Sequence, residues 1–424
     1  MDYLHDFHRR HGALYCEWVP VADIAQAVGT PVYIYSRKTL VEHLQKLQRA
    51  FASVRPLICF SVKSNGNLAI LRLLVRHGAG LDIVSGGELF KARQVGCPSS
   101  KIVFASVGKS AEEMATALKQ DIFFFNVESS AELEALNAIA RRMRRVARVA
   151  LRVNPDVKAD THQYMTTGVK ESKFGIDLAT ACRLLQERDS FQGVRMQGVH
   201  LHIGSQISEA RPFVEAIRRV AGLFADAKRG GAPLEWLNLG GGLGIIYNDE
   251  RPQTPHDYAQ AVLPLIRKLG VRLILEPGRF IVGNAGILVA KVLYVKEAGG
   301  RRLAVVDAGM NDLIRPALYG AYHAVVPVQE SPSTDHGRGT YDVVGPICES
   351  ADVFARDRHL SGVKPDALLA ILGAGAYGST MASNYNGRPR PAEVLVHGRR
   401  WAIIRTRETL RDLIRHDVIP KFAS

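Results

Sequence analysis

The chain is poor in cysteine, in tryptophan and in long hydrophobic runs. Its 424 residues contain no CxxC pair, and its cysteines are widely spaced at Cys16, Cys59, Cys97, Cys182 and Cys348. An odd number of scattered cysteines argues against a disulfide framework or a structural zinc site, and it favours a reducing compartment such as the cytoplasm. The N-terminal segment has charged residues and no apolar core of a secretory signal. No uninterrupted apolar run reaches membrane-spanning length.

Acidic residues are scarce relative to basic ones. Lys and Arg number 55 against 41 Asp and Glu, which gives a formal net charge of +14. A basic balance is typical of proteins that bind nucleic acid, membrane surfaces or small anions. The basic residues are dispersed, and the short run Arg141–Arg145 falls on a predicted helix, where it favours a solvated face. We therefore expect a small anionic ligand, and neither nucleic acid nor a membrane as a partner.

From about residue 57 the sequence alternates short apolar runs with longer amphipathic stretches. The predicted strands are Leu57–Lys63, Gly80–Ser85, Lys101–Ser106, Asp121–Val127, Arg148–Asn154, Gly198–Gly204, Leu234–Gly240 and Arg272–Pro277. Helical patterns lie between them, and Ser110 and Ser129 are plausible N-caps of two of these helices. Eight β-α alternations predict a parallel (β/α)₈ TIM barrel, which we assign to residues 37–282.

The pattern changes after about residue 283. Strand-like runs follow one another with few helices between them, which predicts a C-terminal β-sandwich or β-barrel domain at 283–424. Residues 1–36 are expected to pack with that domain, because Val32–Tyr35 reads as a strand for its sheet. The fold class is therefore α/β plus β. The long loop Asn154–Gly175 has the length of a lid over a site.

Four polar clusters lie at the ends of predicted barrel strands. They are Lys63, His202–Gln206, Gly240–Gly244 and Glu276–Arg279. Groups that follow parallel strands meet at one end of a barrel, where barrel enzymes build their active sites. A desolvated lysine forms Schiff bases, a glycine turn binds an anion, and a buried carboxylate can pair with a pyridinium nitrogen. This combination suggests pyridoxal 5'-phosphate (PLP) as the cofactor.

Each cluster taken alone also has a simpler interpretation. Lys63 could extend from a strand end into solvent, and the segment Glu276–Arg279 could only lock its loop. His200 and His202 share a strand face and could ligate a metal, but no carboxylate or cysteine cluster accompanies them, so no metal is expected. The glycine turn resembles a dinucleotide fingerprint but lacks the acidic residue about twenty positions further on.

Three stretches of the second domain place charged or reactive groups among glycine and proline. They are Asp307–Tyr319, Gly345–Ser350 and Gly373–Gly378. By themselves they could be ordinary turns.

Together these residues resemble the alanine-racemase-like, fold type III PLP-dependent decarboxylases. The stretches Asp307–Tyr319, Cys348–Asp352 and Tyr377–Val394 resemble the diaminopimelate decarboxylase family in particular. The resemblance runs from about Thr30 to the C-terminus. It implies PLP-dependent decarboxylation of meso-2,6-diaminopimelate to L-lysine and CO2, which is the last step of lysine biosynthesis by the diaminopimelate route.

The resemblance also implies a role for individual residues. Catalytic roles fall on Lys63, which holds PLP as a Schiff base, on Cys348, a proton donor, and on His202, which stacks on the ring. The cofactor-binding set is Lys63, His202, Ser205, Gly242, Gly244, Glu276, Gly278, Arg279 and Tyr377. The substrate-binding set is Arg279, Arg315, Tyr319, Glu349 and Tyr377. In such enzymes the residues that match Cys348 and Glu349 reach the neighbouring subunit, so the resemblance implies a homodimer with shared active sites. The segment Thr161–Gly175 resembles the family's mobile lid.

Two segments depart from the family's usual pattern. Phe60–Asn65 reads Phe-Ser-Val-Lys-Ser-Asn instead of Tyr-Ala-x-Lys-Ala-Asn, and Ala105–Lys109 stands where Gly-Asn-x-Lys is common. Neither change removes a catalytic group. Rival readings are a decarboxylase of another amino acid, a racemase and a non-catalytic PLP-binding barrel. A racemase would pair the pyridine nitrogen with a cationic group, which Glu276 is not, and Cys348 and Tyr377 argue against a non-catalytic protein.

Overall fold

In the computed structural model, which describes residues 5–157, 173–231, 233–330 and 339–423, the chain divides into two units. The barrel unit consists of Val41–Ile245 and Glu250–Ile281. The β unit consists of Met1–Leu40, Ile246–Asp249 and Val282–Ser424. The β unit thus includes one short segment, Ile246–Asp249, that lies within the barrel's part of the sequence.

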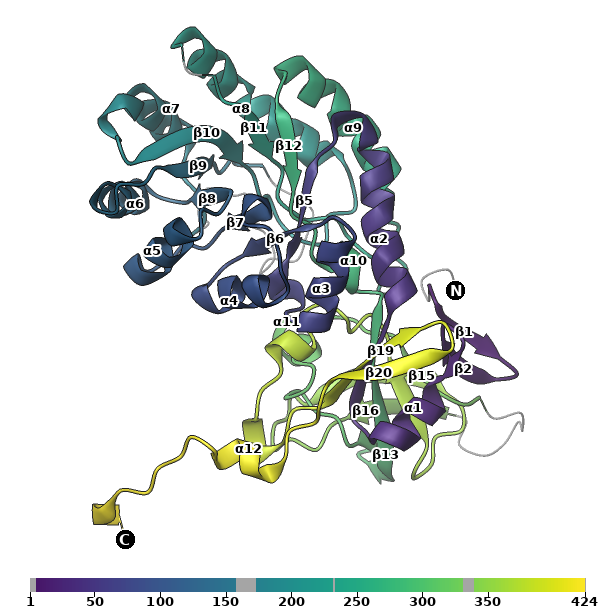
Figure 1. The fold of residues 1–424 in the computed structure, drawn as a ribbon. Coiled ribbons are helices and arrows are strands. Elements are labelled where there is room, and N and C mark those ends of the chain that lie inside the picture. The colour runs from purple at the N-terminus through teal and green to yellow at the C-terminus, as the bar shows by residue number, and fades with distance from the viewer. Residues whose placement is uncertain (1–4, 158–172, 232, 331–338, 424) are drawn as a thin grey trace. The chain divides into compact units, whose positions relative to one another are not determined.

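Eight parallel strands close into a barrel in the order β10-β11-β12-β5-β6-β7-β8-β9 (Figure 1). Their bounds are β5 Leu57–Ser61, β6 Gly80–Ile83, β7 Ile102–Phe104, β8 Phe124–Val127, β9 Ala147–Arg152, β10 Val194–His200, β11 Trp236–Asn238 and β12 Arg272–Leu275. Every strand predicted for the barrel is present, so this part of the fold class is confirmed. Aromatic and aliphatic side chains such as Phe124, Trp236 and Ile274 pack together in a core formed by these strands.

A helix follows each barrel strand, and α2 (Arg37–Ala50) precedes the first (Figure 1). These helices are α3 Leu68–Arg76, α4 Gly86–Gln94, α5 Ala111–Lys119, α6 Ser130–Arg142, α7 Leu178–Gln186, α8 Arg211–Arg229, α9 Pro255–Leu269 and α10 Arg279–Val282. Ser110 and Ser129 cap α5 and α6 as predicted, because each side chain accepts the backbone N–H three residues on.

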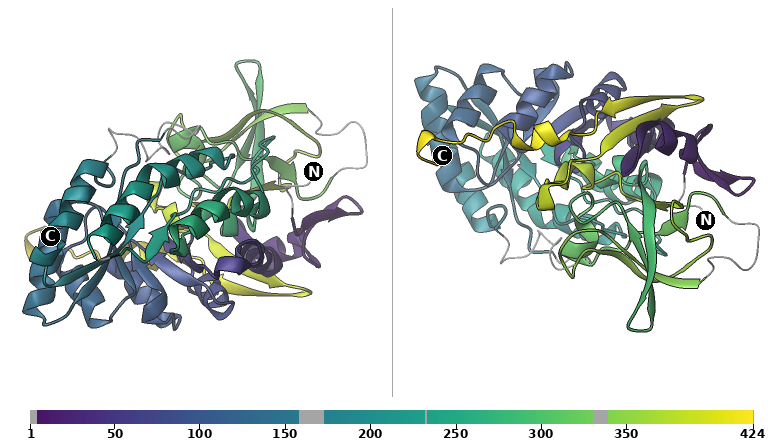
Figure 2. Two further views of the ribbon diagram at one scale, coloured as in Figure 1. Left: turned by 90° about the horizontal axis from the view of Figure 1, so that it is seen from above. Right: turned by 90° about the horizontal axis from the view of Figure 1, so that it is seen from below.

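Among its described residues, the β unit is built on a nine-stranded mixed sheet. Within it, β4 (Val32–Ser36) pairs antiparallel with β13 (Gly286–Ala298) and parallel with β19 (Ala392–His397). The other strands are β14 Arg301–Val306, β15 Val325–Pro327, β16 Gly339–Val344, β17 Val353–Leu360, β18 Leu368–Ile371 and β20 Arg400–Arg405. The hairpin of β13 and β14 stands out in green in Figure 2. The strand-like runs that the sequence shows in this domain are Ile287–Val295, Leu303–Asp307, His323–Pro327, Tyr341–Val344, Leu368–Leu372 and Trp401–Arg405, and none of them corresponds to β17 or β19.

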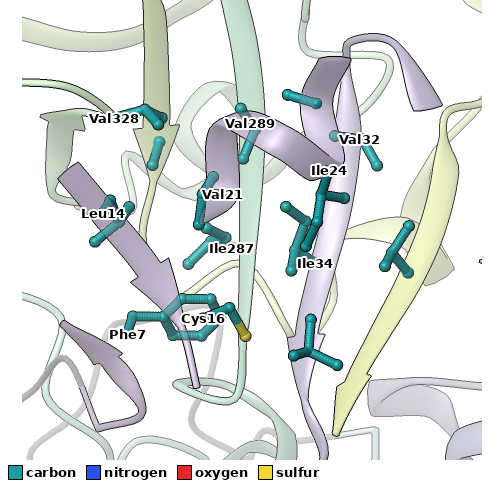
Figure 3. Packing of buried hydrophobic residues seen from close by; sticks show 14 of the residues in the cluster. Phe7, Leu14, Cys16, Val21, Ile24, Val32, Ile34, Ile287, Val289 and Val328 are labelled. Atoms are coloured by element: carbon teal, nitrogen blue, oxygen red, sulfur yellow. The ribbon is translucent and has the colours of Figure 1, made fainter. Parts of the chain in front are cut away.

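The N-terminal segment forms a small sheet and a helix that the sequence analysis did not predict. The elements are β1 (Phe7–Arg10), β2 (Ala13–Cys16), β3 (Val19–Pro20) and α1 (Val21–Val28). Their apolar side chains share one buried cluster with residues of β4 and β13, as Figure 3 shows for Phe7, Leu14, Cys16, Val21, Ile24, Val32, Ile34, Ile287 and Val289.

Glu17 fastens this segment with hydrogen bonds. Its buried carboxylate accepts the Ser36 hydroxyl at 2.9 Å and the Gly398 N–H at 2.5 Å.

Within the described part of the chain, no helix has the length and apolar character needed to cross a membrane.

Candidate active site

Lys63 lies in a turn just past the first barrel strand. The strand was predicted to run to Lys63, but β5 ends at Ser61 and residues Val62–Ser64 form a 3₁₀ turn. The Ser64 hydroxyl donates to the Ser61 carbonyl at 2.7 Å and stabilises this turn. A strand pattern alone does not show that a hydroxyl will close a turn in this way.

The Lys63 amine lies 3.1 Å from Oδ2 of Asp82, on the neighbouring strand β6. Asp82 is fully buried and also accepts the Ser61 hydroxyl at 2.6 Å. Burial raises the pKa of Asp82, and the Lys63 ammonium opposes that rise. Lys63 is thus held at a barrel strand end by a buried partner that the sequence analysis did not identify.

Glu276 directly follows β12 and is buried among hydrogen-bond donors. Its Oε1 accepts the side-chain amides of Asn126 at 2.9 Å and Asn238 at 2.6 Å. Nε2 of His200 lies 3.1 Å from its Oε2. Burial alone would raise the pKa of Glu276, but His200, Lys63 and the Asn238 amide hold it well below its ordinary range. The structure therefore holds a carboxylate anion inside the end of the barrel.

His202 lies two residues past β10, and its ring is neutral. Its Nδ1 accepts the Gly241 N–H at 3.3 Å. Burial, followed by the Arg152 guanidinium and the Lys63 ammonium, lowers the pKa of His202 well below 6.5. A neutral imidazole is a flat apolar surface suited to stacking on an aromatic ring.

The glycine turn after β11 brings the backbone very close to its neighbours. Gly240 has φ +64°, and a Cβ there would lie 2.5 Å from the Leu201 carbonyl oxygen. Gly242 has φ +112°, and a Cβ there would lie 2.9 Å from the Gly204 carbonyl oxygen. No side chain fits either position without movement. Ile207 binds the turn through its N–H to the Gly242 carbonyl at 2.8 Å.

The segment after β12 joins the same rim. Arg279 begins α10, is buried, and donates from Nε and Nη2 to the Ser205 hydroxyl at 3.2 and 3.0 Å. A Cβ at Gly278 would lie 3.0 Å from the Ser64 side chain. Ser205, Gly278 and Arg279 thus form a cationic, tightly packed wall that suits an anionic group.

Other buried polar groups support Glu276. The Lys109 amine is buried, binds Oε1 of Glu132 at 2.6 Å, and donates to the Asn126 carbonyl at 2.8 Å. Lys109 belongs to the segment 105–109 that departs from the family pattern, and here it anchors the strand whose Asn126 side chain binds Glu276. Asn126 and Asn238 could have been identified in the sequence because each is a polar residue inside an otherwise apolar strand.

In the β unit, Arg315 is fixed from two sides. It begins α11 (Arg315–Tyr319), is buried, and lies over the Tyr247 ring, its Cζ 4.8 Å from the centroid. Nδ1 of His323 lies 2.8 Å from the Leu372 carbonyl oxygen and therefore carries a proton, so Nε2 accepts from Arg315 Nη1 at 2.9 Å. Tyr319 lies at the last position of α11.

Cys348 and Glu349 are exposed on a loop that a buried aspartate holds. Asp352 accepts the Met310 N–H at 2.6 Å and the Ile347 N–H at 2.7 Å, so it joins this loop to the stretch before Arg315. The Cys348 N–H donates to Oδ1 of Asn386 at 2.9 Å, and the Tyr385 hydroxyl donates to Glu349.

Tyr377 adopts φ +57°, in the left-handed region, within the glycine-rich segment after β18. The barrel unit thus holds Lys63, His202, Ser205, Gly242, Gly244, Glu276, Gly278 and Arg279, and the β unit holds Arg315, Tyr319, Cys348, Glu349 and Tyr377. Of the predicted lid, residues 161–172 lie outside the described part of the chain.

Comparisons with known proteins show the family to which the chain is similar. Residues 37–283 match the pyridoxal-binding domain of the pyridoxal-dependent decarboxylases. Diaminopimelate decarboxylase of Haemophilus influenzae is 46% identical, over 96% of this chain and 98% of that protein. The diaminopimelate decarboxylase of Aquifex aeolicus is 44% identical, over 94% of each chain.

Solved structures are similar over the whole chain. Diaminopimelate decarboxylase of M. jannaschii in co-complex with L-lysine has a TM-score of 0.94 and 37% identity, covering 100% of both chains. The Helicobacter pylori enzyme complexed with L-lysine has a TM-score of 0.89 and 40% identity, covering 93% of this chain and 98% of that one.

The barrel, the strand-end lysine and the family match define the chain as a PLP-dependent decarboxylase with pyridoxal phosphate as its cofactor. The residues present fit this cofactor, because a lysine amine, a neutral imidazole, an anionic carboxylate and a glycine turn without room for side chains all occur at one barrel end. Identity over nearly the full length narrows the class, and the chain belongs to the diaminopimelate decarboxylase family.

Proposed function

We propose that the protein decarboxylates meso-2,6-diaminopimelate to L-lysine and CO2. The observation that carries this proposal is the buried Glu276 carboxylate, which accepts amide N–H groups from Asn126 and Asn238, because an anion at the pyridine nitrogen favours decarboxylation over racemisation. The names of the full-length relatives and the L-lysine bound to two similar structures support the choice of substrate and product.

Pyridoxal phosphate, when bound, supplies a protonated ring that takes up the electron pair left behind by departing CO2. In this proposal Lys63 holds the cofactor covalently and Glu276 keeps a proton on the ring nitrogen. His202 stacks on the ring face as a neutral imidazole. Ser205, Gly242, Gly244, Gly278 and Arg279 surround its phosphate side with N–H and guanidinium donors.

The substrate roles fall mainly on the β unit. We propose that Arg315 and Arg279 bind the distal carboxylate, with Tyr319 and Tyr377 beside the substrate, and that Glu349 binds the distal amine. The Cys348 thiol returns a proton to the carbon that has lost CO2. Because Cys348 and Glu349 are exposed in the single chain, we propose that they complete the site of a second copy, in a homodimer with shared sites.

The distal carboxylate decides specificity. A substrate without it cannot form the ion pair with a buried guanidinium such as Arg315, and the loss of that ion pair costs about 2–5 kcal/mol. Ornithine, arginine and lysine are therefore disfavoured as substrates by at least one order of magnitude.

The decisive experiment is an assay of the purified protein with PLP and meso-diaminopimelate, in which CO2 and L-lysine are both measured. We expect both products in equal amounts, and little turnover of ornithine or lysine under the same conditions. Failure to form either product, with turnover of another amino acid, would refute the proposed substrate. The Lys63→Ala variant is the control, and it should lack both turnover and a cofactor link that borohydride reduction makes permanent.

We also propose that residues 1–36 and 283–424 form one domain and residues 37–282 a second, which the grouping of the chain into two units supports. A cytoplasmic location is proposed on the basis of the cysteines, since all five are thiols without a disulfide partner.

A further inference from the structure

His200 is a buried histidine to which neither the sequence motifs nor the proposed mechanism assign a role. It is the last residue of β10, two positions before His202, and it is 1% exposed. Its Nε2 lies 3.1 Å from Glu276 Oε2. Its Nδ1 has no hydrogen-bond partner within the described ranges. The nearest polar group for this imidazole is therefore the carboxylate.

The two carboxylate oxygens of Glu276 differ in the hydrogen bonds that they accept. Oε1 already accepts two amide N–H groups, from Asn126 and Asn238. A carboxylate oxygen has about two acceptor positions, so Oε1 is saturated. Oε2 faces His200 and keeps acceptor capacity for one further donor. Oε2 is therefore the oxygen that can receive the N–H of a bound pyridinium ring.

We infer that His200 is a positioning residue for Glu276: its Nε2, 3.1 Å from Oε2, holds the carboxylate in the orientation that serves the ring nitrogen of the cofactor. The inference rests on the proposed function, because it concerns the electron-accepting strength of the bound ring.

The proton must lie on Nε2. An unprotonated Nε2 would point its lone pair at a carboxylate, and in a buried site like charges are not screened by water. A protonated Nε2 presents the positive end of an N–H dipole whether or not Nδ1 carries a proton as well. The opposing possibility is that His200 only fills space in the barrel, in which case an apolar ring of similar size would replace it without consequence.

The charged residues near His200 already bind groups other than Glu276. The residues paired with His200 on the adjacent strands are Arg152 on β9 and Asn238 on β11. Arg152 Nη1 lies 2.8 Å from both oxygens of Glu128, which occupy it. Lys63 is 3.1 Å from Asp82 and is needed for the cofactor. His200 is therefore the group beside Oε2 that has no other polar assignment within the described residues.

The test compares His200→Phe and His200→Asn with Val199→Ala in the full-length enzyme. Val199 is equally buried on the same strand and points to the opposite face, so its variant reports the effect of lost packing alone. The readouts are kcat, KM and the nitrogen chemical shift of bound, ring-¹⁵N-labelled PLP.

For His200→Phe we expect kcat to fall about 10- to 100-fold, the range found when supporting groups of metal ligands are lost, while KM changes by less than about twofold. The ring-nitrogen signal should move toward the unprotonated position. His200→Asn, which restores an N–H donor, should recover part of both effects, and Val199→Ala should change stability only. A protonated ring nitrogen and unchanged kcat in His200→Phe would overturn the inference.

A second measurement needs neither cofactor nor activity. In the wild-type protein without PLP, ¹H–¹⁵N spectra of the histidine rings should show Nε2 of His200 protonated, and a signal from an unprotonated Nε2 would overturn the inference even if the Phe variant did not fold. If diaminopimelate were not a substrate but the ring-nitrogen signal still followed His200, only the proposed function would fail. If lysine were formed but the ring-nitrogen signal did not change when His200 was replaced, only this inference would fail.

Discussion

Glu88 lies on α4 near Lys63 and Asp82, and its carboxyl group is partly buried. Burial raises the pKa of Glu88 to about 7 and Asp82 adds to the rise, although Oε2 accepts the Val84 N–H at 2.8 Å. A raised carboxyl pKa stabilises the folded state below the unfolded value of 4.5, and that contribution is lost as pH rises through about 7.

Glu88→Gln should remove this dependence on pH. Between pH 5 and pH 8 we expect the free energy of unfolding of the wild type to fall relative to that of the variant, by on the order of 2 kcal/mol. Urea unfolding at both pH values measures the difference, and Glu112→Gln, an exposed change on α5, is the control. Parallel pH profiles for wild type and Glu88→Gln would show that the carboxyl group is ionised throughout.

At the scale of elements, Asp352 holds two substrate-side segments together in the β unit. It accepts backbone N–H groups from Met310 and Ile347, one just before the Arg315 helix and the other just before Cys348. Burial raises the pKa of Asp352 while these two hydrogen bonds lower it. One side chain therefore sets the relative position of two loops.

Asp352→Asn should disturb both loops, because an amide nitrogen then faces one of the two N–H donors. We expect a loss of about 1.5–3 kcal/mol in unfolding free energy and a lower kcat/KM for diaminopimelate. The rate of Cys348 alkylation should change, while Asp366→Asn, a control whose side chain is 87% exposed, should leave all three quantities unchanged. Unaltered alkylation in Asp352→Asn would show that the Cys348 loop does not depend on this carboxylate.

The elements that could be predicted from the sequence have a clear hydrophobic period, and the elements that were not predicted lack one. The barrel strands are apolar runs between amphipathic helices, so all eight were found. Strand β17 places Arg356, Asp357 and Arg358 in succession and shifts register with β16, which breaks the alternation that marks a strand. The two- to four-residue strands of the N-terminal segment are too short to show a period.

The same limit applies to the site. Residues that follow strands, such as Lys63 and Glu276, could be predicted because the barrel brings strand ends together. Their partners could not, because the contact of Asn126 with Glu276 joins positions 150 residues apart. Which polar residue within an apolar strand faces the barrel interior, and which charge it meets there, depends on the closure and register of the whole barrel.

At the scale of the whole molecule, the two kinds of site residue belong to different units. The proposed cofactor residues lie in the barrel unit, and the proposed substrate-side residues Arg315, Cys348 and Glu349 lie in the β unit. If the protein is a homodimer with shared sites, each active site must combine Lys63 of one chain with Cys348 of the other. Variants at these two positions can therefore be combined to reveal which chains complete one site.

Lys63→Ala and Cys348→Ser homodimers should each be nearly inactive, because one lacks the cofactor link and the other the proton donor. When the two variants are co-expressed with different tags and the mixed dimer is purified, one site receives both intact residues and the other receives neither. We expect this dimer to have about half the wild-type activity. If Lys63 and Cys348 served the same site within one chain, the mixed dimer would contain no intact site and would stay as inactive as its parents. A mixed dimer of Lys63→Ala with a chain carrying both changes is the control, since no arrangement of its chains restores a site.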